Sequence, residues 1–188
     1  MMKSKNRIIV IGASGVGKTT LVESLTPLLS LKIIPEIARV LCQEMGYQRI
    51  GEIPDQEGFK RKVLDAQIET EEKLDTFISD RSTIDCWVLW QRWNICQAMT
   101  YDSEAYYAKA RKQAEKYSSI IYIPPMFPPP EDDFRWTDLD YQKQIDRLIK
   151  MTLYEWELLD RVYTVKSDQP ANRIKETEHW LQSNSPHH

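Results

Sequence analysis

The sequence lacks the marks of several large classes of protein. No apolar run approaches the roughly 20 residues that a membrane-spanning helix needs, so we expect no membrane partner. The three cysteines, Cys42, Cys86 and Cys96, are odd in number and show no C-x-x-C spacing, which predicts buried or half-buried thiols in a reducing compartment. Positive charge is not in excess: the formal net charge is −3 and the pI about 5.7, which argues against nucleic acid as a partner. These absences predict a soluble, cytoplasmic protein.

What remains is the composition of an ordinary globular domain. With 41% hydrophobic and 28% charged residues, the 188-residue chain can bury a full core without disulfides or metals. The sequence contains no internal repeat and no sign of a second core, so residues 1–182 are expected to form a single domain. Residues 183–188 are polar, end in two histidines and are expected to be a tail.

Glycine is scarce, and half of it stands in one motif. Three of the six glycines fall in the run Gly12–Thr19, GASGVGKT, which fits the phosphate-binding P-loop pattern G-x-x-x-x-G-K-[ST]. The apolar, β-branched run 7–11 before it predicts a buried strand, and the apolar residues in 20–29 after it recur with a helical period. Such a turn aims backbone N–H groups and a helix N-terminus at one point, where a phosphate fits.

The motif predicts an ATP and Mg²⁺ site. Lys18 is expected to reach the β- and γ-phosphates, and the Thr19 hydroxyl to hold the metal ion. The predicted nucleotide-binding residues are Gly12, Ala13, Ser14, Gly15, Val16, Gly17, Lys18, Thr19 and Thr20.

Strand-like runs alternate with longer helical patterns along the whole chain. This alternation predicts an α/β fold of three layers, the P-loop NTPase fold, with a five-stranded parallel sheet in the order 2-3-1-4-5 and helices on both faces. The proline-rich segment that follows the fourth strand cannot be a helix or a central strand, and we expect it to form a lid over about 124–138. Strands are expected at 7–11, 31–34, 76–80, 118–123 and 161–165, and helices at 18–29, 36–45, 55–73, 82–98, 103–116, 138–159 and 171–183.

P-loop proteins include GTPases, ATPases and small-molecule kinases. A GTPase needs a D-x-x-G switch and a polar residue at the start of its base-reading N/T-K-x-D motif. Asp80 is followed by Arg-Ser-Thr instead, and the only similar run, Val165–Asp168, begins with valine. An AAA-type motor would need a helical lid domain for which the chain has too few residues. Both classes are disfavoured.

Two acid-arginine pairs favour a kinase. Asp80 ends an apolar strand beside the P-loop strand, where Mg²⁺ needs an anionic anchor, and Arg81 follows it in the turn, where a guanidinium can bind phosphoryl oxygens. After the second strand come Glu36 and Arg39, three residues apart on a first helical turn. Glu36 is placed to accept the proton of an attacking hydroxyl, and Arg39 to orient the acceptor. The alternative is a routine pair at a helix N-terminus.

Together these motifs resemble the AAA_28-type P-loop NTPases, which are similar to nucleoside and nucleotide kinases such as deoxynucleoside kinases, thymidylate kinase and ribosylnicotinamide kinase. The resemblance rests on the P-loop, on Pro35-Glu36-x-x-Arg39, Gln67 and Asp80-Arg81-Ser82, and on the lid run 133–138. It implies that Glu36 is the general base, that Asp80 and Arg81 serve Mg²⁺ and the phosphates, and that the lid residue Arg135 clamps the transferred phosphoryl group. It also implies that adenine lies near 166–173. The single lid arginine departs from the arginine-rich lids of deoxynucleoside kinases.

Two features leave alternatives open. Gln67 either pairs bidentately with a base edge, as the deoxynucleoside kinases imply, or is a surface residue between two acids. Trp87, Trp90 and Trp93 recur at helical spacing, which favours the core or a homodimer interface over a base-stacking pocket. The sequence as a whole predicts ATP-dependent phosphoryl transfer to a small-molecule acceptor, with substrate contacts from Glu36, Arg39, Gln67 and Arg81. A regulatory ATPase that acts on a protein partner is the alternative.

Overall fold

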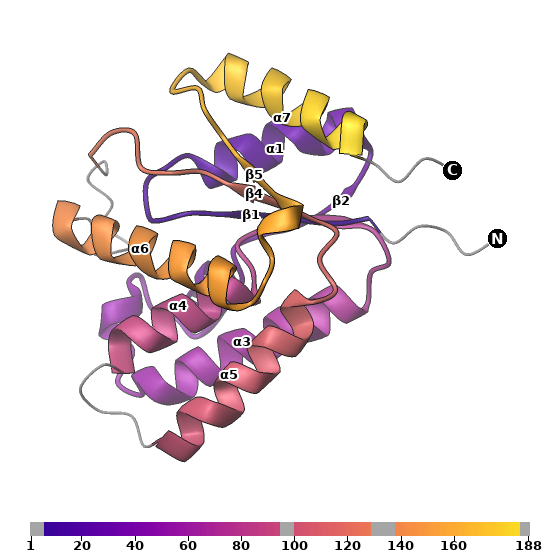
Figure 1. The fold of residues 1–188 in the computed structure, drawn as a ribbon. Helices are drawn as coiled ribbons and strands as arrows, with labels where there is room; N and C mark the ends of the chain where they lie inside the picture. Colours follow the sequence, from indigo (N-terminus) through magenta and orange to yellow (C-terminus); the bar gives the residue numbers. More distant parts are fainter. Residues whose placement is uncertain (1–5, 95–99, 129–137, 185–188) are drawn as a thin grey trace.

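The computed structural model describes residues 6–94, 100–128 and 138–184. Its centre is a parallel sheet of five strands in the order β2-β3-β1-β4-β5 (Figure 1). This is the order predicted from the sequence. The strands are β1 (Arg7–Ile11), β2 (Lys32–Ile34), β3 (Phe77–Asp80), β4 (Ser119–Tyr122) and β5 (Val162–Thr164).

Helices cover both faces of the sheet, as expected for β-α-β connections in parallel sheets. Helices α1 and α7 lie on one face, and α3, α4, α5 and α6 lie on the other (Figure 1). The helices are α1 (Lys18–Leu29), α2 (Ile37–Glu44), α3 (Gln56–Glu72), α4 (Thr83–Asn94), α5 (Thr100–Ala114), α6 (Leu139–Glu155) and α7 (Pro170–Asn184), with short 3₁₀ turns η1 (Ile50–Glu52) and η2 (Leu159–Arg161).

The core forms where the sequence is most apolar. All of β1 is buried, because a strand covered by helices on both faces contacts protein on both sides. Trp87 and Trp90 of α4 are also buried: Trp87 meets Tyr107 edge-on at 4.9 Å, and Trp90 stacks on Tyr106 at 4.1 Å. These two rings therefore serve the core of the chain itself.

The ends of elements differ from the predictions by small amounts. The last helix runs to Asn184, so Ser183 and Asn184 belong to the fold and not to the polar tail. Residues 124–128 of the expected lid carry no helix or strand, while the rest of it up to 137, with Arg135, lies outside the described residues. The final residues of the helix expected at 82–98, Cys96 among them, also lie outside that part.

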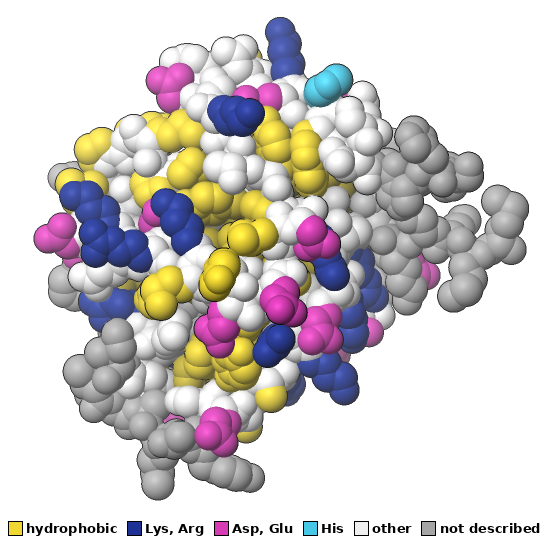
Figure 2. Space-filling model, in the orientation of Figure 1, with side chains coloured by type: hydrophobic (Ala, Val, Ile, Leu, Met, Phe, Trp, Pro, Cys, Tyr) yellow, Lys and Arg dark blue, Asp and Glu magenta, His cyan; other side chains and the backbone are white. Residues whose placement is uncertain are grey.

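Surface charge is balanced on the face drawn in Figure 2, where basic and acidic side chains are intermixed. This matches the small net charge of the chain. Among the described residues, no helix is both long and apolar enough to cross a membrane.

Candidate active site

The P-loop turns between β1 and α1 in a shape that requires its glycines. A Cβ atom on Gly12 would lie 2.6 Å from the carbonyl oxygen of Ile123, at the end of β4, so no side chain fits there. Gly17 caps α1 with φ of 92°, a left-handed conformation that glycine adopts without strain. The loop is therefore packed against the carboxyl end of the sheet and leads directly into a helix N-terminus.

The loop's carbonyl oxygens are bound by side chains of the protein. Lys18 Nζ donates to the carbonyls of Gly12 and Ala13, at 2.9 and 2.7 Å. Gln142 Nε2 donates to Ser14, at 3.0 Å, and Arg173 Nη1 donates to Val16, at 2.7 Å. A loop whose carbonyls are satisfied in this way is suited to present its N–H groups to an anion. Sequence reasoning missed Gln142, because a glutamine on an amphipathic helix carries no signal of such a contact.

Thr19 and Asp80 lie together at the mouth of the loop, as predicted. The Thr19 hydroxyl donates to Asp80 Oδ2 at 2.5 Å, and Asp80 is only 4% exposed. The other carboxylate oxygen, Oδ1, is buried and has no hydrogen-bond partner among the described residues. An anionic oxygen left unpaired in this way is costly unless a cation binds it. Hydroxyl and carboxylate oxygens are ligands that suit Mg²⁺, which keeps its remaining positions for water and phosphate.

Arg81 is held in a strained backbone conformation between two carboxylates. Its φ of 81° is left-handed, which costs a side-chain-bearing residue on the order of 1–3 kcal/mol. Its guanidinium lies 2.8 Å from Glu36 Oε1 and 3.4 Å from Asp85 Oδ1. Burial opposes the charge of Arg81, yet Glu36, Asp85 and Asp80 together raise its pKa above the ordinary value. The contacts with Glu36 and Asp85 thus hold a buried cation beside the P-loop.

Through its contact with Arg81, Glu36 connects the two predicted acid-arginine pairs, Glu36–Arg39 and Asp80–Arg81. It occupies the N-cap position of α2 without a capping hydrogen bond from its side chain, and it is 7% exposed, with Oε2 at 3.5 Å from Arg39 Nε. Arg39 is far more open, with its side chain 40% exposed. Asp85, which the sequence analysis missed, completes the group by accepting from Ser82 at 3.0 Å. Only its four-residue spacing from Arg81 could have indicated it.

A pocket of about 340 Å³ opens beside this group. Ser14 of the P-loop, Glu36, Arg81 and Asp85 contribute to its wall. The walls also carry four aromatic rings and several aliphatic side chains, from Phe59, Trp93, Tyr106, Tyr141, Ile37, Val63 and Leu89. A pocket that is mostly apolar and carries a few convergent polar groups is typical of a small-molecule site.

Lys60 stands in the same pocket and was not singled out by the sequence. Its ammonium group lies 5.2 Å from the centre of the Trp93 ring. Burial lowers the pKa of Lys60 to about 8. Of the three tryptophans, Trp93 lines this pocket, whereas Trp87 and Trp90 pack in the core.

Gln67 also lines the pocket, so the interpretation as a surface residue is wrong. It is 2% exposed, and its amide nitrogen donates to Glu71 Oε1 at 2.8 Å and to Ser79 Oγ at 3.2 Å. Both amide hydrogens are engaged within the protein. A bidentate contact with a base edge, which would need one of them, is not available in this arrangement.

A second, smaller cavity of about 110 Å³ lies on the other side of the loop. Gly17 and Thr20 border it, together with Asp168 and Arg173 from the segment expected near adenine. Arg173 is fixed there by its contact with Val16 and by a hydrogen bond of 2.7 Å from Nε to the carbonyl of Ser167.

This architecture defines a class: the chain has the fold of the P-loop kinases, with a phosphate-binding loop and a separate pocket beside it. More particularly, it belongs to the AAA_28 family, described as an AAA domain, whose model matches residues 7–171. No curated protein matches the sequence.

Several solved structures share the fold at low sequence identity. The NadR protein in complex with NAD and AMP-PNP superposes with a TM-score of 0.72 at 17% identity, covering 96% of this chain and 50% of NadR, so the chain spans about half of that protein. Deoxyadenosine kinase from M. mycoides with bound dATP gives 0.59 at 14%, covering 94% and 99%. Shikimate kinase from Acinetobacter baumannii with shikimate gives 0.62 at 14%, covering 97% and 96%. At such identities the likeness establishes the fold.

Proposed function

We propose that the protein transfers the γ-phosphoryl group of Mg²⁺·ATP to a hydroxyl group of a nucleoside, a nucleotide or a similar small acceptor. One observation carries the proposal: the 340 Å³ pocket is bordered by the P-loop through Ser14 and by the Glu36–Arg81 pair. A molecule in this pocket lies next to the place where the loop's N–H groups would hold a triphosphate. The solved relatives of this fold include small-molecule kinases, which supports the reaction type.

The residues divide the reaction between them. The P-loop and Lys18 bind the phosphates, and Thr19 and Asp80 would hold Mg²⁺, which neutralises charge on the phosphates when it is bound. Arg81, a fixed and buried cation, stabilises the charge of the phosphoryl group in transfer. Since such a transition state is loose, positioning supplies most of the rate and the base has a modest task.

Glu36 is the candidate base. It is a buried carboxylate that borders both the pocket and the first turn of α2, with Oε1 at 2.8 Å from Arg81 Nε and Oε2 at 3.5 Å from Arg39 Nε. Asp85 also borders the pocket, with Oδ1 facing Arg81 and Oδ2 accepting from Ser82. The acceptor itself is expected to carry a flat ring, because Phe59 and Trp93 belong to an aromatic wall that favours stacking.

An acceptor screen tests the proposal. ADP formation is measured with nucleosides, nucleoside monophosphates and nicotinamide riboside, each against a blank without acceptor. We expect at least one acceptor to raise turnover on the order of 100-fold, and its phosphorylated product to appear by mass spectrometry. Slow hydrolysis that no acceptor stimulates would reject the kinase and indicate a regulatory ATPase.

A further inference from the structure

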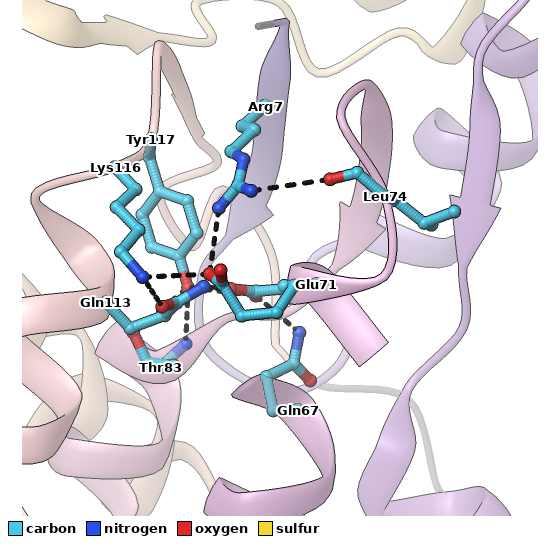
Figure 3. Close-up of polar contacts among 9 residues, drawn as sticks. Arg7, Gln67, Glu71, Leu74, Thr83, Gln113, Lys116 and Tyr117 are labelled. Atoms are coloured by element: carbon cyan, nitrogen blue, oxygen red, sulfur yellow. Dashed lines mark hydrogen bonds and ion pairs between the residues drawn. The ribbon is translucent and has the colours of Figure 1, made fainter. Parts of the chain in front are cut away.

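A buried polar cluster lies behind the pocket wall, centred on Glu71 of α3 (Figure 3). Glu71 is fully buried, and its two oxygens receive hydrogen bonds from Gln67 at 2.8 Å, Gln113 at 2.7 Å and Tyr117 at 2.9 Å. A carboxylate this deeply buried needs such donors, since each missing one would leave an anionic oxygen without a partner.

The direction of each hydrogen bond can be worked out from the outer members of the cluster. Lys116 Nζ can only donate, and it lies 2.9 Å from Gln113 Oε1, so the Gln113 amide must turn its nitrogen to Glu71. The Thr83 N–H donates to the Tyr117 oxygen at 3.1 Å, which directs the Tyr117 hydrogen away from that amide. The Thr83 hydroxyl donates to the carbonyl oxygen of Ala110 at 3.0 Å, so the Tyr117 hydrogen has two acceptors within reach, the Thr83 hydroxyl oxygen at 3.0 Å and Glu71 at 2.9 Å. A charged carboxylate is the stronger acceptor of the two. Gln113 and Tyr117 therefore both donate a hydrogen bond to Glu71.

Charge balance favours the ionised form of Glu71. Arg7 and Glu72 form an ion pair at 3.1 Å, and Lys116 lies 2.9 Å from the same Glu72 oxygen. Two cations thus face two carboxylates, Glu71 and Glu72, and the cluster is neutral only when Glu71 carries its charge. Burial nevertheless keeps the pKa of Glu71 above its ordinary value, and the hydrogen bonds from Gln67, Gln113 and Tyr117 and the charge of Arg7 offset only part of that rise.

An ionised Glu71 fixes the amide of Gln67. The amide nitrogen turns toward Glu71, and Figure 3 shows the carbonyl oxygen on the side away from it. The second amide hydrogen goes to Ser79. Since Gln67 lines the pocket, the oxygen is the group left for a ligand, and no described residue donates to it.

We propose that Glu71 is a positioning residue that makes Gln67 a hydrogen-bond acceptor toward the pocket, so that the bound acceptor molecule must present an N–H donor there. The inference rests on the proposed function of this pocket as the acceptor site. The fold alone does not specify the acceptor, but this inference does in part: its ring should carry an N–H group on one edge, as adenosine and uridine do. A ring with no donor on that edge would leave the Gln67 oxygen unpaired.

Two matched pairs of probes test this by isothermal titration calorimetry in the presence of AMP-PNP and Mg²⁺. Adenosine is compared with purine riboside, which lacks the amino group, and uridine with 3-methyluridine, which lacks the ring N–H. The wild-type protein should bind the donor-bearing member of at least one pair about 10-fold more tightly or better, which is the scale of an unpaired buried acceptor.

Variants of the cluster separate positioning from a structural role. In Glu71→Gln the new amide nitrogen can donate to Gln67, which allows the Gln67 amide to turn round, so the preference within the pair should fall below about 3-fold. The exchange Gln67→Glu with Glu71→Gln places an acceptor-only group at the pocket and a donor behind it, and the preference should return. Glu72→Gln removes the same charge from the adjacent position without touching Gln67, and should keep the wild-type preference.

The outcomes test the role of Glu71 and Gln67 separately from the proposed kinase function. If the wild-type protein binds both members of each pair alike or binds none of the four probes, or if Glu71→Gln keeps the preference, the inference is overturned. Thermal unfolding shows whether Glu71→Gln folds. If it does not, the test rests on the affinity ratio within each probe pair, measured for the wild-type protein and for the double variant with Gln67→Glu and Glu71→Gln. Selective binding without any phosphoryl transfer would support this reading of Gln67 and reject the proposed function; transfer without selectivity would do the reverse.

Discussion

Replacing Glu36 by glutamine tests the assignment of the base with little disturbance of the site. Glutamine keeps the shape of the side chain and can still accept from Arg81 Nε at the 2.8 Å position, but it cannot take up a proton. Arg81 also retains Asp85 at 3.4 Å. The variant should therefore fold, at a cost of about 1–3 kcal/mol, less than the 3–5 kcal/mol typical when one partner of a buried ion pair is removed outright.

The effect on the reaction should be much larger than the effect on binding. A positioned general base contributes about 10²–10⁴-fold, which corresponds to roughly 3–5 kcal/mol of the activation barrier. We therefore expect kcat with the best acceptor to fall by about that factor in Glu36→Gln, with the Kd for ATP within about 3-fold of the parent. Glu36 lies outside the P-loop, so its replacement should leave the binding of ATP nearly unchanged.

The assay combines three measurements: kcat from ADP formation, the Kd for ATP from calorimetry and the free energy of unfolding from urea titration. Glu44→Gln is the matched control, because Glu44 is an exposed carboxylate at the other end of α2, and this variant should keep the parental kcat and cost under about 1 kcal/mol of stability. A Glu36→Gln variant that transfers phosphate at the parental rate would refute the assignment of the base.

Three further predictions concern the metal, the pocket and the loop. Asp80→Asn removes the charge of the carboxylate whose Oδ1 is unpaired, so the Mg²⁺ concentration for half-maximal activity should rise at least about 10-fold; an unchanged titration would argue against this metal site. Because the pKa of Lys60 is about 8, half of its side chains are neutral at pH 8, against under about 1% for an ordinary lysine. Amine-reactive labelling at pH 8 read by mass spectrometry should favour Lys60 and be blocked by the acceptor, and labelling that ignores the acceptor would place the ligand elsewhere. Gly12→Ala forces a methyl group against the Ile123 carbonyl and should lower stability by about 2 kcal/mol or more; parental stability in urea would show that the loop can yield.

The sequence predicts the frame of this protein well, because strong local patterns determine it. The strand 7–11 and the helix 18–29 occur as predicted, since a short β-branched run before a glycine-rich turn and a helical repeat after it leave few alternatives. The P-loop also brings Thr19 and Asp80 together, because strands that neighbour each other in a parallel sheet end at the same edge.

The sequence could not predict how the polar side chains of the pocket are shared. Gln67 was recognised as a candidate, but its orientation depends on Glu71, Gln113 and Tyr117, which come from distant parts of the chain. The left-handed backbone of Arg81 carries no signature, since glycine would be the usual residue there. Asp85 and Lys60 lie on helices whose polar residues look solvent-exposed in the sequence. Only the packing of these helices in the fold buries the two side chains.

A product balance in a single reaction tests directly whether the protein is a kinase. With Mg²⁺·ATP and the best acceptor, ADP and phosphorylated acceptor should form in equal amounts, inorganic phosphate should be a small fraction, and Lys18→Ala should make neither product. Equal amounts of ADP and inorganic phosphate with no phosphorylated acceptor, in the presence of every acceptor tested, would contradict the proposed function.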